Sequence, residues 1–259
     1  MATSSEIPNE APLKLAHAPI VEAVVDIRCD MPPAFDLAAL ESLAQDTFRD
    51  HYPKLQKQLI ETHSFVKKGD EPPAISATQG LQAFQFLTDD GRQLVQVRAE
   101  GFSFNRLAPY TSLDDYLPEI ERAWGLFVGL ASPVQVREIR VRYINRLPLP
   151  TVEGRVDFDD YLKVAPHLPD EKRLHFIGFF NQHAAVDVET GNQATIILTM
   201  QPPEKNLVPL IFDIETVSRG SSEPNDWESI RSKLVSLRSL KNQIFENTLT
   251  DKCLNLFRH

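Results

Sequence analysis

Three arginines, Arg140, Arg142 and Arg146, lie in the stretch VQVREIRVRYINRLPLP at residues 134–150. Side chains alternate between the two faces of a β-strand, so a strand here places the arginines opposite the apolar Ile139 and Val141. Such a row of guanidinium groups can bind an anionic ligand or a protein partner. It can also form ion pairs with carboxylates of neighbouring strands, which is the commoner arrangement. The residues alone leave both interpretations open.

Two acidic residues, Asp213 and Glu215, share one face of the stretch LVPLIFDIE at residues 207–215. They are the expected partners of Arg140, Arg142 or Arg146. Carboxylates spaced in this way also hold Mg²⁺ or Mn²⁺ in some hydrolases. Because no third acid or histidine at a recognisable spacing completes such a site, we predict no metal and no cofactor.

The first half of the chain carries a similar set of charges. Glu22 and Asp26 alternate with apolar residues near position 25, and we expect them to lie opposite Arg98 and Arg106. The sequence has no glycine-rich phosphate loop and no G-x-S-x-G motif. The candidate binding residues are therefore the charged ones on strand faces: Arg98, Arg106, Arg140, Arg142, Arg146, Asp213 and Glu215.

Composition restricts the class of protein. The chain has 259 residues, is 42% hydrophobic and has a formal net charge of −9, which argues against binding to nucleic acid or to an anionic membrane. No apolar run approaches the roughly 20 residues that a membrane span requires. Two cysteines, Cys29 and Cys253, are too few for a disulfide framework and predict free thiols in a cytoplasmic protein.

In the first half we expect a strand at 20–29, a helix at 37–52 and a short strand at 63–67, followed by a loop at 69–73. A hairpin follows, with strands at 81–88 and 92–107 around a turn at 89–91, and Gly101 indicates a bulge or bend in the second strand. Ser112 then begins a long amphipathic helix that reaches Val128.

The second half repeats this order. It predicts a strand at 134–147, a short helix at 158–164 capped by Asp157, a hairpin from about 175 to 200 with its turn at 190–192, and a strand at 207–216. Asn225 or Asp226 caps a long final helix, whose charged outer face includes Lys241. Its apolar stripe could continue into a dimer through Leu254, Leu256 and Phe257.

These elements predict an α+β fold. Each half consists of a strand, a helix, antiparallel strands and a long helix, and the two halves suggest a duplication. We expect an antiparallel sheet, continuous or in two parts, with helices packed on one face. The predicted organisation is a flexible arm at 1–12 and two halves at 13–132 and 133–259, which could form one continuous domain.

Three short motifs occur in order along nearly the whole chain: APIVEA at 18–23, RYINR at 142–146 and FExxLTD at 245–251. In these motifs the chain resembles a sporadically distributed bacterial family of uncharacterised proteins of about this length. The resemblance implies a bacterial accessory protein and transfers no active site.

These observations lead to two hypotheses of different classes. The first is a non-enzymatic binding or assembly protein, a homodimer, whose charged sheet face or groove holds a protein partner or an anionic small molecule. The alternative is an enzyme, a metal-assisted hydrolase or another enzyme of small molecules, with its site between the two halves and with Asp213 and Glu215 as its acids. The sequence leaves enzymatic activity undecided, although it favours binding.

Overall fold

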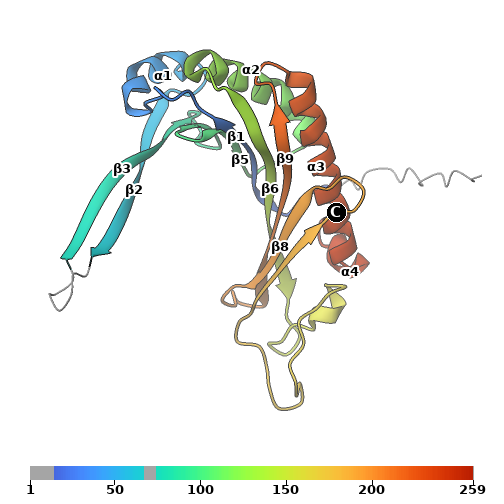
Figure 1. Ribbon diagram of the computed structural model, residues 1–259. Helices are drawn as coiled ribbons and strands as arrows, with labels where there is room; N and C mark the ends of the chain where they lie inside the picture. Colours follow the sequence, from blue (N-terminus) through green and yellow to red (C-terminus); the bar gives the residue numbers. More distant parts are fainter. Residues whose placement is uncertain (1–14, 67–73, 259) are drawn as a thin grey trace, which may run out of the picture.

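The computed structural model describes residues 15–66 and 74–258 of the chain. Within this part the protein is α+β, with a nine-stranded antiparallel sheet and four α-helices (Figure 1). The predicted arm at 1–12 and loop at 69–73 lie outside the described residues. No described helix is long and apolar enough to cross a membrane.

The elements follow one another along the chain. The strands are β1 Ile20–Asp30, β2 Lys54–Val66, β3 Ala74–Leu87, β4 Gln93–Arg98, β5 Gly101–Leu107, β6 Gln135–Pro150, β7 Phe180–Val186, β8 Gln193–Met200 and β9 Leu207–Ser222. The helices are α1 Glu41–Phe48, α2 Leu113–Ala131, α3 Trp227–Thr248 and α4 Asp251–Asn255, with short 3₁₀ turns η1 Ala38–Leu40 and η2 Phe158–Asp160.

The sheet has the strand order β2-β3-β4-β5-β1-β6-β9-β8-β7. The first strand of each half pairs with the last strand of its own half, so β1 pairs with β5 and β6 pairs with β9. The two first strands also pair with each other, from Ile20↔Asn145 to Asp30↔Gln135. One continuous sheet therefore joins the halves at its centre, and the alternative of two separate sheets is excluded for the described residues.

The helices pack on one face of this sheet (Figure 1). The odd-numbered residues of β1, among them Val25 and Ile27, point into a core with α1, α2 and the first half of α3. A second core lies further along the same face, where β6 and β9 meet the end of α3 and α4 around Phe212 and Phe245, whose rings stack 5.8 Å apart. The even-numbered residues of β1 point to the opposite face.

Helix ends are capped as the sequence predicts. The Ser112 side chain accepts a hydrogen bond from the Asp115 amide at the start of α2, and Asp226 accepts one from the Ser229 amide at the start of α3. Asp157 caps the 158–164 segment, but this segment forms only the turn η2, because Leu162 bridges to Leu249 instead of continuing a helix.

The single strand predicted at 92–107 is wrong. Residues 93–107 form two strands, β4 and β5, that turn back at residues 99–100 and pair with each other. Gly101 has a φ of +138°, which side chains other than glycine rarely adopt, and a Cβ there would lie 2.1 Å from the Ile27 carbonyl oxygen. The glycine thus permits a tight hairpin that packs against β1.

The strand predicted at 63–67 is the end of the much longer β2. This strand forms a hairpin with β3 that projects from the rest of the sheet (Figure 1), and its described side chains, such as Gln56 and Gln58, are mostly exposed. A strand exposed on both faces has no alternation of apolar and polar residues, so its sequence carries little strand signal.

The predicted dimer stripe at the C-terminus is also wrong. Leu254 and Phe257 are buried in the second core of their own chain, and only Leu256 of the three is exposed. The two cysteines are free, as predicted, and both are buried.

Candidate functional site

Charged side chains gather on the sheet face that the helices leave uncovered. We call this surface the charged face and define it by residues of β1, β4, β6 and β9: Glu22, Asp26, Arg28, Arg98, Glu138, Arg140, Arg142, Asp213, Glu215 and Arg219. The register brings them together, because Asp26 lies opposite Arg140, and Arg142 lies opposite Glu215. The ladder of backbone hydrogen bonds therefore fixes the spacing of these charges.

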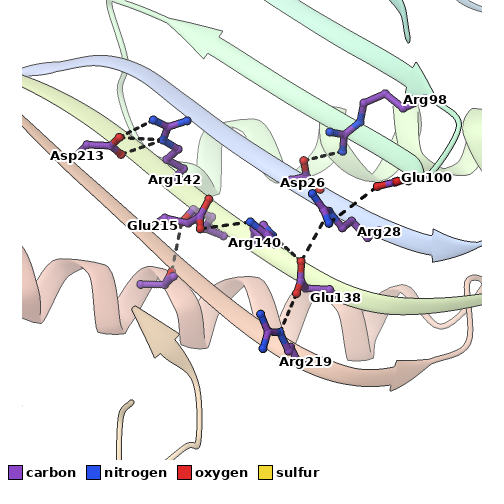
Figure 2. Close-up of polar contacts among 12 residues, drawn as sticks. Asp26, Arg28, Arg98, Glu100, Glu138, Arg140, Arg142, Asp213, Glu215 and Arg219 are labelled. Carbon is purple, nitrogen blue, oxygen red and sulfur yellow. Dashed lines mark hydrogen bonds and ion pairs between the residues drawn. The ribbon is translucent and has the colours of Figure 1, made fainter. Parts of the chain in front are cut away.

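Arg142 and Asp213 form a bidentate ion pair at one end of this face (Figure 2). The Arg142 Nε donates to Asp213 Oδ1 at 2.9 Å, and Nη2 donates to Oδ2 at 2.5 Å. The hydrogen bond to Asp213 raises the pKa of Arg142 above its usual value. The Asp213 side chain is only 8% exposed, whereas that of Arg142 is 45% exposed, so the guanidinium still presents a surface.

Glu138 accepts hydrogen bonds from two arginines on either side of it. Arg140 Nε donates at 2.5 Å and Arg219 Nε at 2.9 Å, while Arg28 Nε lies 3.7 Å away (Figure 2). Burial by itself would raise the pKa of Glu138, but the hydrogen bonds from Arg140 and Arg219 outweigh burial and lower it. Arg140 also reaches Glu215 at 3.3 Å, which links this group to β9.

At the other end of the charged face, Arg98 Nη2 donates to Asp26 Oδ2 at 2.6 Å. Three buried atoms near this pair, Asp26 Oδ1, Arg28 Nε and Arg98 Nε, have no hydrogen-bond partner among the described residues. A buried polar atom without a partner costs about 1–3 kcal/mol. This end of the charged face therefore has hydrogen-bonding capacity that the described residues do not use.

The structure brings together five of the seven predicted binding residues: Arg98, Arg140, Arg142, Asp213 and Glu215. Arg146 also lies on the uncovered face, but Ile144 separates it from Arg142, and it pairs with Glu204 at 2.7 Å. Each arginine of β6 contacts a carboxylate. Of the two interpretations of these arginines, the one that expected ion pairs therefore describes the geometry that the structure shows.

Arg106 is the exception, and its predicted placement with the other arginines is wrong. Its guanidinium carbon lies 5.4 Å from the centre of the Tyr116 ring of α2, on the helix-covered face. Arg106 shares its side of β5 with Phe104, whose ring contacts Tyr116 as well. The positions of Phe102, Phe104 and Arg106, two residues apart along β5, agree with this placement. Glu22 instead accepts a hydrogen bond from Asn105 at 2.8 Å.

A cleft of about 650 Å³ lies in the second half, not between the halves. The end of β6, η2 and the irregular residues 166–176 line it, with an aromatic wall that includes Phe158 and Phe176, whose ring centres are 5.7 Å apart. At its rim His167 contacts Glu171 at 3.1 Å and Asp159 at 3.6 Å. The sequence analysis missed this cleft, because irregular segments carry no periodic signal.

No cluster of three or more metal-binding side chains occurs in the part of the chain that the structure describes. Asp213 and Glu215 both contact guanidinium groups, so a cation at this pair would have to displace Arg142 or Arg140. The geometry therefore gives no support to the metal-assisted alternative at these two acids.

The sequence analysis also placed one further cation, Lys241, on the wrong side of its helix. Lys241 belongs to the buried side of α3, and its ammonium nitrogen lies 4.1 Å from the centre of the Tyr143 ring. Burial lowers the pKa of Lys241 to about 8. The Tyr143 hydroxyl in turn lies 2.9 Å from that of Tyr110.

Comparisons of the chain with family models, with curated proteins and with solved structures found no match. The resemblance to the sporadically distributed bacterial family therefore stays a prediction, and any function has to be argued from the geometry of the chain itself.

Proposed function

We propose that this chain is a binding or assembly protein whose charged face docks a protein partner. The observation that carries the proposal is the sheet itself: helices pack on one side only, and the other side presents an ordered set of charges of both signs. Each half places its first strand at the centre of the sheet and its later strands outward in reverse order, with five strands in one half and four in the other, and this order supports a duplicated unit that builds one wide surface.

The ion pairs favour a protein over a small anion. Arg140 and Arg142 already have carboxylate partners at 2.5–3.3 Å, so an anionic ligand would have to compete with Asp213, Glu138 or Glu215. A protein surface with charges of both signs can instead meet the exposed sides of these pairs without breaking them. Arg142 is the best such contact, because nearly half of its side chain is exposed although its carboxylate partner is buried.

The test is Arg142→Glu with Arg231→Glu as its matched control. Arg231 is an exposed arginine of α3 that pairs only with the exposed Glu228 among the described residues, and it lies away from the charged face. Wild-type protein, purified gently from its own host and analysed by native mass spectrometry, should retain a partner. Arg142→Glu should lose that partner, while Arg231→Glu should keep it.

Circular dichroism and thermal unfolding of both variants serve as the folding control. If Arg142→Glu unfolds, the arginines act as structural ion pairs, and Arg142→Gln then tests binding without the charge repulsion. If both glutamate variants fold and bind alike, the charged face is not the docking surface.

A second candidate function is supported by the 650 Å³ cleft, whose size suits a small molecule. The aromatic wall would hold an apolar group, and the acids at the rim, Asp159 and Glu171, would favour a cationic one. Thermal shift measurements with aromatic amines test this function, with Phe176→Ala as the cleft variant. The cleft is not a ligand site if no amine stabilises the wild-type protein more than it stabilises Phe176→Ala.

A further inference from the structure

The strand β7 forms one edge of the nine-stranded sheet, and only β8 pairs with it among the described strands. Its sequence, FNQHAAV, has no charged residue, no proline and no irregularity in its seven-residue register with β8. Six of its seven residues are exposed, and the seventh, Asn181, is half-buried. Natural proteins usually protect edge strands with lysine, proline or bulges, because an open edge pairs readily with another chain.

Alternation along β7 shows which backbone groups are free to pair outward. At the two ends of the β7–β8 ladder, the Asp187 amide donates to the Asn192 carbonyl and the Met200 amide donates to the Phe179 carbonyl. Odd-numbered residues therefore face β8. The amide and carbonyl groups of Phe180, Gln182, Ala184 and Val186 point away from the sheet.

The opposite edge of the sheet differs in composition. The described part of β2 has Lys54 and Lys57 within its first four residues, and Lys57 pairs with Glu41 at 2.6 Å. These charges protect the beginning of the β2 edge in the usual way. The edge strand without any charged residue is thus β7.

Two apolar residues that flank β7 are almost fully exposed. Ile177 is 99% exposed and Val188 is 95% exposed, and within the strand Phe180 and Val186 are 64% and 59% exposed. Four exposed apolar side chains along one edge are typical of a surface that another protein covers.

We infer that β7 pairs with β7 of a second copy of this chain, antiparallel, about a two-fold axis between the two copies of His183. In this register the outward-facing residues lie opposite one another: Phe180 opposite Val186 of the other copy, and Gln182 opposite Ala184. All four outward pairs then exchange backbone hydrogen bonds. Phe180 and Val186, which are 64% and 59% exposed, then cover each other across the ribbon.

The lack of charge on β7 supports a second copy as the occupant. Because β7 has no charged residue, two copies can lie side by side without bringing like charges together, and Phe180 gains Val186 of the other copy as an apolar neighbour. Stable interfaces bury about 1,200 Å² or more, so a seven-residue ribbon needs added area from the exposed residues that flank it.

The oligomeric state tests this inference, and the test does not depend on the charged face. Light scattering coupled to size-exclusion chromatography should give twice the chain mass of 29.3 kDa at micromolar concentration. Ala184→Pro removes an outward amide without touching the β8 ladder, and should shift the protein to the monomer mass. Ile60→Lys, at an exposed position of the β2 edge, should leave the dimer intact.

Ala184→Lys provides a second β7 variant in case the proline prevents folding, and circular dichroism checks both. A wild-type monomer would overturn the inference. So would a dimer that survives both Ala184 variants, or one that Ile60→Lys alone disrupts.

Disulfide formation tests the register. His183→Cys places two thiols opposite each other in a non-hydrogen-bonded pair, where strands approach most closely, and should give a covalent dimer on a non-reducing gel. Gln182→Cys is the matched control, because its counterpart in the other copy lies diagonally across the ribbon and should stay reduced. The native Cys29 and Cys253 are buried and give little background. Efficient cross-linking of Gln182→Cys but not of His183→Cys would rule out this register.

Discussion

The two faces of the sheet hold their cations in different ways. On the helix-covered face, Lys241 lies over the Tyr143 ring without a carboxylate partner among the described residues. On the charged face, Arg140 and Arg142 each contact a carboxylate and remain partly exposed. Exposed pairs contribute little to stability, whereas a buried charge without a counter-ion is costly. The covered face therefore contributes more to folding stability than the charged face does.

Adjacent residues of β5 give the largest expected contrast. Phe102 is fully buried, 5.9 Å from the Trp124 ring centre, and Phe102→Ala should lower the free energy of unfolding by about 3–5 kcal/mol. Ser103 points to the other face and donates to Asn105 at 3.2 Å, so Ser103→Ala should cost about 1 kcal/mol. Urea denaturation measures both, and equal losses would contradict the comparison.

Lys241→Met tests the covered face with a substitution that should stabilise the protein instead of destabilising it. A lysine whose pKa falls from 10.5 to about 8 on folding destabilises the native state below pH 8, and this cost disappears as pH rises from 8 to 10.5. After the loss of its contact with Tyr143, the methionine should still raise the free energy of unfolding at pH 7 by about 1–2 kcal/mol. The gain should shrink between pH 7 and pH 10, as measured by urea denaturation, and a constant gain would mean that Lys241 does not titrate as described.

A double-mutant cycle on Arg142 and Asp213 tests the charged face, with an expected effect no larger than that of Lys241→Met. Arg142→Leu leaves the buried Asp213 carboxylate without its partner and should cost about 1–2 kcal/mol. The double variant with Asp213→Leu should recover much of that loss, because no unpaired charge remains. Chemical denaturation of the four proteins gives the coupling energy, and strict additivity would show that the pair contributes nothing.

Much of the fold follows from alternation and caps that are local in the sequence. The strands around Val25 and Val141 alternate clearly because one of their faces is buried, and Ser112 and Asp226 cap their helices as predicted. The grouping of Arg140, Arg142, Asp213 and Glu215 followed from the same parity. These are the parts of the molecule in which burial and sequence pattern have the same period.

The remaining features depend on contacts between distant residues. Gly101 marked a special backbone position, but only the approach of Ile27 required the chain to turn back there. The burial of Lys241 depends on Tyr143 from another strand, and the burial of Phe257 depends on the second core. Exposed strands such as β2 show little alternation, so the sequence predicted only the end of β2, whereas the turn at 190–192 located the hairpin of β7 and β8.

The pairing of β1 with β6 has a consequence for synthesis on the ribosome. β1 can pair with β5 once residue 107 has been made, but its other side stays open until β6 is complete at residue 150. At about 5–20 residues per second, a nascent chain exposes that edge for seconds. The charges of Glu22, Asp26 and Arg28 on this edge discourage association between neighbouring nascent chains during that interval.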